Sequence, residues 1–235
     1  MTTKNLAALP LTLLFTLLPA SLLGGEDEWP AVSEDGLQLV PNSRMAAVYV
    51  QPGADLAPYY RVMLAEPQVA FRKNWERDLR SQSASKLSTS SRVNTTKIKE
   101  NLAREFKSVF TDKLTAGGYE VVTEAGDDVL LILPAIVNLD ITAPETSGSG
   151  RTNSYVRSAG EMTLYLELYD SVTGDIIAKA VDRQVDRENN QMYTWANSST
   201  NKAAADRILN GWADILIAAL NEAKAPAPAP QAAED

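Results

Sequence analysis

The chain has 235 residues and a net charge of −8, with 22 basic residues, 30 acidic residues, no His and no Cys. Without Cys there is no disulfide framework, and without His the commonest metal ligand and the commonest neutral-pH acid–base group are missing. The negative charge disfavours nonspecific binding to nucleic acid, which depends on Lys and Arg. We therefore expect a globular protein with no cofactor and no metal.

Residues 1–25 have the pattern of a secretory signal peptide. A basic start with Lys4 precedes an uncharged apolar run over 6–24, and small residues surround Ala20. The run is also just long enough to span a bilayer, so an uncleaved N-terminal anchor is the alternative, and it would be the chain's only membrane contact. In both cases we expect an exported protein, periplasmic or associated with the outer membrane.

The exported part is predicted to be one domain. Residues 26–45 mix acids, prolines and scattered apolar residues and predict an extended lead-in to a single domain over 46–224. Strands are expected at 46–50 and 60–71. Pro67 interrupts the second strand, and because proline cannot donate to a ladder, we expect a bulge or a sheet edge there.

The first helix has the clearest periodicity. A Ser/Thr-rich insertion at 81–96 precedes a helix predicted over 96–116, capped by Asn94, Thr95 or Thr96 and stopped by two glycines at 117–118. One helical face collects the apolar residues Ile98, Leu102, Phe106, Val109, Phe110 and Leu114.

Four strands and a second helix follow. Alternating apolar residues predict strands at 119–123, 129–141, 160–169 and 176–183. Between them, composition predicts a flexible loop at 142–157 and a hairpin turn at 170–175. An apolar stripe predicts a helix at 199–224, and a disordered Ala/Pro tail follows at 225–235. This order predicts an α+β fold. The simplest packing is a two-layer sandwich, a mostly antiparallel sheet with two amphipathic helices on one face.

Three stretches resemble a known family. They are VYVQPGADLAPYYRVMLAEPQVAF with Asn74 and Trp75 after it, the helix over 98–116 running into GGYEVV, and LYLELYDSVTGDIIAKAVDR at 164–183. Trp212 is a looser match. Together they resemble an uncharacterised family of bacterial envelope lipoproteins, domain of unknown function thirty-three-thirteen.

The resemblance implies an envelope α+β domain and carries no known reaction, so no functional residues transfer. The chain departs from the family at Gly25, where the lipidated Cys is expected. This departure puts membrane tethering in doubt and leaves the expected fold unchanged.

Acidic residues give no convincing catalytic pattern. Asp127 and Asp128 precede a strand, and Asp170 to Asp175 form a turn that lacks the full calcium-loop spacing, so solvated turns are the better interpretation. The sequence has neither a G-x-S-x-G elbow nor a supported S-x-x-K motif. We assign no catalytic residue.

One surface segment is a candidate for a partner contact. Phe71, Arg72 and Trp75 place aromatic and cationic side chains where a strand gives way to a polar segment, and partner-binding patches use such residues. Alternatively, Trp75 folds back over the sheet edge as a lid on the core.

Three functions remain open. The first is a noncatalytic envelope protein, a structural or protein-interaction module that contacts another envelope protein or the cell wall. The second is a periplasmic carrier of a small molecule or lipid, which requires a closed apolar cavity. The third is a hydrolase that uses Ser or carboxylates, which requires a cleft with convergent polar groups.

Overall fold

The structure is a computed structural model that describes residues 29–83, 93–141, 154–156, 158–187, 194–196 and 198–224. The chain divides into two units, Met1–Pro30 and Ala31–Asp235, and every helix and strand given below belongs to the second. The predicted signal or anchor at 1–25, the tail at 225–235 and most of the predicted loop at 142–157 lie outside the described residues.

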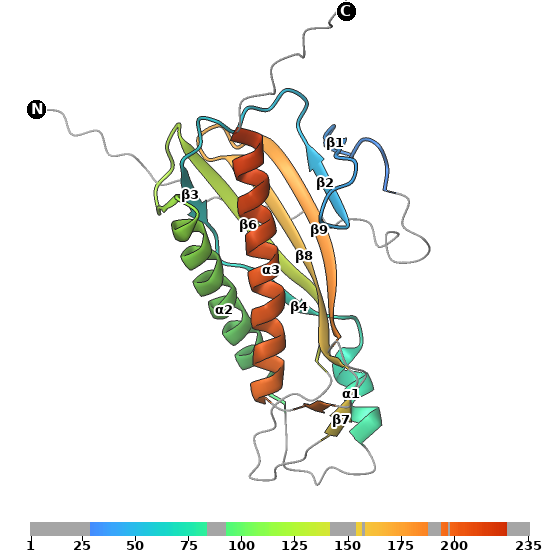
Figure 1. The fold of residues 1–235 in the computed structure, drawn as a ribbon. Coiled ribbons are helices and arrows are strands. Elements are labelled where there is room, and N and C mark those ends of the chain that lie inside the picture. The colour runs from blue at the N-terminus through green and yellow to red at the C-terminus, as the bar shows by residue number, and fades with distance from the viewer. Residues whose placement is uncertain are drawn as a thin grey trace, which may run out of the picture. The chain divides into compact units, whose positions relative to one another are not determined.

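The described part of the second unit contains one large sheet, one small sheet and three helices (Figure 1). The strands of the large sheet are β1 (Gln38–Leu39), β2 (Ala47–Val50), β3 (Arg61–Leu64), β4 (Gln68–Phe71), β5 (Glu120–Val121), β6 (Val129–Ile141), β8 (Ser158–Asp170) and β9 (Ile176–Arg187). The small sheet pairs β7 (Ser154–Val156) with β10 (Thr194–Ala196). The helices are α1 (Trp75–Ser83), α2 (Thr95–Ala116) and α3 (Ser198–Lys224).

The large sheet is mostly antiparallel. Its order is β1-β2-β9-β8-β6-β3-β5, and β4 pairs with β6 beyond the end of β3. The pairs from β1 to β6 are antiparallel, whereas β3 and β4 run parallel to β6 and β3 runs parallel to β5. Parallel neighbours need a crossover, and the chain between β4 and β5 supplies it with α1 and α2. The predicted α+β class with a mostly antiparallel sheet is confirmed.

The two long helices lie side by side in front of the sheet (Figure 1). The predicted helix over 96–116 is confirmed as α2, and the Asn94 side chain caps it by accepting a hydrogen bond of 2.9 Å from the Lys97 N–H. Past the helix end, Gly118 has a φ of 90°, which glycine adopts without strain. The predicted helix over 199–224 is likewise confirmed as α3.

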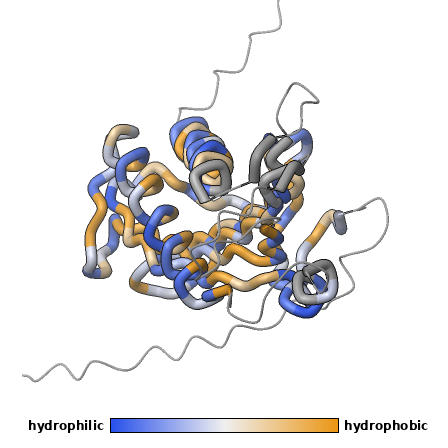
Figure 2. The backbone as a smooth tube through the Cα atoms, turned by 90° about the horizontal axis from the view of Figure 1, so that it is seen from below, coloured by the Kyte–Doolittle hydropathy of each residue, from blue (hydrophilic) through white to orange (hydrophobic). Residues whose placement is uncertain are grey.

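Large apolar side chains fill the space between the helices and the sheet. Hydrophobic residues concentrate in the strands at the centre of Figure 2, and hydrophilic ones lie toward the outside. The largest fully buried side chains include Phe106, Phe110 and Leu114 of α2, Leu209, Trp212 and Leu220 of α3, and Val62, Leu130, Ile132, Ile136 and Leu164 of the sheet. The stripe predicted for α2 therefore forms core.

A bulge separates β3 from β4. Leu64 pairs with Ile132 and Gln68 pairs with Ala135, so four steps along one chain accompany three along β6. Pro67 lies in this bulge, as expected for a residue without an N–H to donate. Pro134 lies opposite this bulge, between Ile132 and Ala135 of β6. No N–H is needed there to pair with β3 or β4, so a central strand can accommodate a proline.

The structure differs from the sequence-based description in two elements. The lead-in expected over 26–45 contains β1, and Leu37 beside it is only 1% exposed, so the compact unit begins earlier than residue 46, at Ala31. Helix α1 was not expected, because its sequence WERDLRSQS has no apolar stripe beyond Trp75 and Leu79. Part of the Ser/Thr-rich insertion, residues 84–92, lies outside the described residues.

Candidate interaction surface

The three residues proposed as a partner contact lie at the junction of β4 and α1. Phe71 ends β4, Trp75 begins α1, and Asn74 between them has a φ of 65°, a conformation that Asn tolerates better than most residues. This turn brings the two aromatic rings together. They stack with centroids 4.2 Å apart and planes 17° from parallel.

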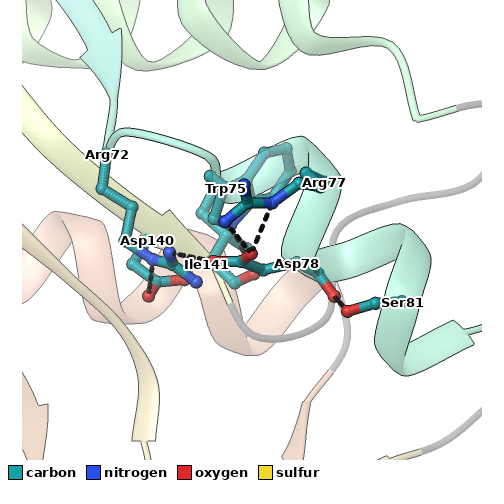
Figure 3. Close-up of polar contacts among 7 residues, drawn as sticks. All are labelled: Arg72, Trp75, Arg77, Asp78, Ser81, Asp140 and Ile141. Carbon is teal, nitrogen blue, oxygen red and sulfur yellow. Dashed lines mark hydrogen bonds and ion pairs between the residues drawn. The ribbon is translucent and has the colours of Figure 1, made fainter.

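Trp75 is buried rather than offered to solvent. Its side chain is 2% exposed, and its indole Nε1 donates a hydrogen bond of 3.3 Å to the Ile141 carbonyl at the end of β6 (Figure 3). Trp75 thus covers the sheet edge, as the lid interpretation expects. A partner contact of this segment stays a prediction, and in this conformation the indole presents no surface for it.

Arg72 is held by two carboxylates. Its guanidinium donates to Asp140 of β6 and, over 2.7 Å, to Asp78 of α1 (Figure 3). These hydrogen bonds raise the pKa of Arg72, and the one from Arg72 lowers the pKa of Asp78. Arg72 therefore ties α1 to two strands, and an anionic partner would have to compete with bonds already made.

An open groove of about 780 Å³ lies next to this junction, between the β3–β4 segment and α2. On the strand side it is lined by Glu66, Pro67 and Val69. The helix side presents Lys99, Glu100, Ala103, Arg104, Lys107, Ser108, Thr111 and Asp112. The sequence pattern does not indicate this groove, because the charged side of an amphipathic helix has the pattern of an ordinary solvated face.

Two cations of α2 reach across to the strand segment. Lys107 Nζ donates to Glu66 over 3.2 Å, and Lys99 Nζ lies 5.8 Å from the centroid of the Phe71 ring. These contacts place the row of α2 that contains Lys99, Ala103 and Lys107 beside β4, since residues four apart share a helical face. The groove thus has a strand edge on one side and, on the other, a helix wall of mixed charge whose row beside β4 contains two lysines.

The acidic turns considered in the sequence perform structural roles. Arg61 donates two hydrogen bonds to Asp128 and lowers the pKa of its carboxyl. Asp170 accepts from the backbone N–H of Val172 and Thr173, as in an ordinary hairpin turn, and from the Tyr59 hydroxyl over 2.7 Å. Within the described ranges, no group of three or more acidic side chains is placed to hold a metal ion.

Comparison with protein families shows to which family the chain belongs. Residues 31–216 match the family described as "Protein of unknown function (DUF3313)". The chain belongs to this family. The match confirms the resemblance drawn from the opening strand, the first helix and the hairpin, and it begins at the first residue of the compact unit.

Solved structures provide more distant likenesses. The PelC dodecamer from Paraburkholderia phytofirmans is 12% identical with a TM-score of 0.33, covering 69% of this chain and 94% of that chain. A protein from Xanthomonas campestris is 12% identical with a TM-score of 0.40, covering 75% of this chain and 90% of that chain. The search of curated proteins gives no match. None of the described helices is long and apolar enough to cross a membrane.

Proposed function

We propose that this member of the DUF3313 family is a noncatalytic, protein-binding module of the bacterial cell envelope. Its partner would be another envelope protein or a component of the cell wall. Export rests on the signal-peptide pattern of residues 1–25, and binding rests on the groove between β4 and α2. In this proposal the helices and the sheet form the two-layer sandwich expected from the sequence, a rigid support for a surface site.

The groove is the main support for a protein partner, because it is open and bordered by charged side chains. Ligand sites for small molecules are mostly apolar and enclose most of their ligand. Here three carboxylates and three cations line the walls, and the apolar contribution comes from Pro67, Val69 and Ala103. A wall of this composition suits the polar rim and main chain of a protein partner.

The carrier hypothesis has less support. A carrier would hold its ligand between the helices and the sheet, where Phe106 and Phe110 are 0% exposed and Trp212 is 1% exposed. Their rings occupy that space, and the two phenylalanine rings stack with centroids 3.9 Å apart. No cluster of side chains described above favours a hydrolase. Asp128, Asp170 and Asp78 each accept hydrogen bonds that stabilise the fold.

Cell fractionation and photo-crosslinking test the proposal together. A photo-crosslinking amino acid at Gln68, exposed on β4, should capture a specific partner in the envelope fraction of intact cells. The same amino acid at Val172, 57% exposed in the hairpin turn, serves as the matched control. Recovery of the full-length chain in the cytoplasm, or equal capture from both positions, would contradict the proposal.

A further inference from the structure

The outer edge of β4 has main-chain N–H and C=O groups that form no sheet hydrogen bonds among the described residues. The Arg72 N–H donates over 3.1 Å to the Leu139 carbonyl of β6. Because successive residues of a strand direct their N–H and C=O groups to alternate sides, Ala70 and Gln68 also face β6, whereas Val69 and Phe71 face away from it. Across the described residues, no strand pairs with that outer side and no backbone hydrogen bond occupies it.

This edge opens into the groove. Val69 and the preceding Pro67 are among its lining residues, and α2 forms the opposite wall. An exposed edge of this kind is a template for another strand, and proteins usually cover it, shorten it or charge it. Here the groove of about 780 Å³ lies between the edge and the charged helix row, and an added backbone would lie in it.

The charge of that wall indicates which side chains the added strand would carry. Among the described residues, Lys99 and Arg104 form no ion pair, although both line the groove. Asp112 lies about two helical turns beyond Arg104, and Glu66 is already paired with Lys107. Glu100, next to Lys99 in the chain, also lines the groove, so the part near the end of β4 carries two cations and one carboxylate and is the more basic part.

We infer that the β4 edge binds an extended acidic peptide segment of a partner protein as an additional β-strand, with carboxylates directed at Lys99 and Arg104. Main-chain hydrogen bonds to Val69 and Phe71 would supply affinity, and the cations of α2 would supply selectivity. This inference rests on the proposed function and specifies its partner.

The test uses the exported chain and two dye-labelled peptides, one alternating Thr with Glu and one alternating Thr with Lys. Fluorescence anisotropy should show saturable binding of the acidic peptide, at least about tenfold tighter than that of the basic peptide. The Lys99→Glu variant should weaken acidic binding about tenfold, whereas Lys97→Glu, the same charge change outside the groove lining, should leave it close to wild type.

A second variant tests the main-chain contact. Val69→Pro removes an outward N–H and places the proline ring where an added strand would lie, while the inward groups of Gln68 and Ala70 still face β6. Because the Val69 side chain also packs against the core, the melting temperature of the variant should fall by a few degrees while the chain stays folded, and acidic peptide binding should be lost. Absence of saturable binding to the wild type, or unchanged binding to a folded Val69→Pro chain, overturns the inference.

Crosslinking in cells separates this inference from the function on which it rests. If Val69→Pro loses peptide binding and also the Gln68 crosslinks, both hold. If the Gln68 crosslinks persist in Val69→Pro, the chain still binds its partner and the added-strand mode is wrong. If the wild-type chain yields no crosslinks specific to Gln68, the proposed function itself fails.

Discussion

The indole Nε1 of Trp212 donates a buried hydrogen bond of 2.7 Å to the Asp182 carboxylate, joining α3 to β9. Asp182 is 5% exposed and also accepts from the Gln184 side chain over 2.7 Å and the Ala46 N–H over 3.1 Å. A buried carboxylate is costly unless such donors surround it. The network therefore fixes how helix, strand and the start of β2 meet.

Trp212→Phe should destabilise the domain by about 1.5–3 kcal/mol for the lost hydrogen bond to a charged group, with a further packing loss because phenyl is smaller than indole. Trp75→Phe is the matched control. It has the same loss of ring volume, but its lost bond is longer, 3.3 Å, and ends on a neutral carbonyl, so the hydrogen bond should contribute only about 0.5–1.5 kcal/mol. Urea unfolding measures both, and equal losses would contradict a special role for Asp182.

Trp75→Ala should lower the free energy of unfolding by about 3–5 kcal/mol, as expected when a buried tryptophan is truncated. The lid over Phe71 and the end of β6 would be lost. Chemical denaturation is the measurement, with the exposed neighbour Lys73→Ala as a control near zero. A Trp75→Ala chain that melts like the wild type would show that the ring contributes no core packing.

The Tyr59 hydroxyl should ionise well above its ordinary pKa of 10.0. Burial, and then the hydrogen bond and negative charge of Asp170, raise the pKa of Tyr59 to about 12. A raised pKa favours the neutral form in the folded state, so this stabilisation is complete below pH 10 and is lost as the pH rises toward 12.

Phenolate absorbance measures this directly. The titration of the wild type minus that of Tyr59→Phe should have its midpoint near 12. A midpoint at 10 would mean that the contact between Tyr59 and Asp170 does not persist in solution.

Gly160→Ala should destabilise the pairing of β6 with β8. A Cβ added at Gly160 would lie 2.6 Å from the Asp140 carbonyl oxygen, so one strand must shift, at a cost of about 1–3 kcal/mol. Gly211→Ala in α3 is the control, because nothing lies within 4 Å of its Cβ position and alanine favours the helix by about 0.5–1 kcal/mol. Thermal unfolding should show shifts of opposite sign.

The exported protein should begin between Ser21 and Glu26. The small residues that follow the apolar run predict cleavage there. N-terminal sequencing and intact mass of protein from the envelope fraction test this expectation. An N-terminus at Met1 or Thr2 would replace cleavage with an uncleaved anchor.

Local periodicity in the sequence was enough to locate the long elements. The stripe from Ile98 to Leu114 located α2, and the uninterrupted apolar alternation over 129–141 located β6, because each pattern repeats long enough to distinguish helix from strand. The α+β class and the mostly antiparallel sheet followed from the order of these elements. The family resemblance came from the same stretches.

Tertiary contacts decided the elements without a local pattern. Helix α1 is held in place by Trp75 packing on Phe71 and by the ion pair of Arg72 with Asp78, and its nine residues are too few for a repeating pattern to locate it from the sequence. Other features depend on residues far apart in the chain. They are the parallel pairing of β3 and β4 with β6, the hydrogen bonds from Tyr59 to Asp170 and from Trp212 to Asp182, and the groove beside Val69. A periodic pattern indicates which face of an element is buried, whereas the element that packs on that face depends on how the whole chain folds.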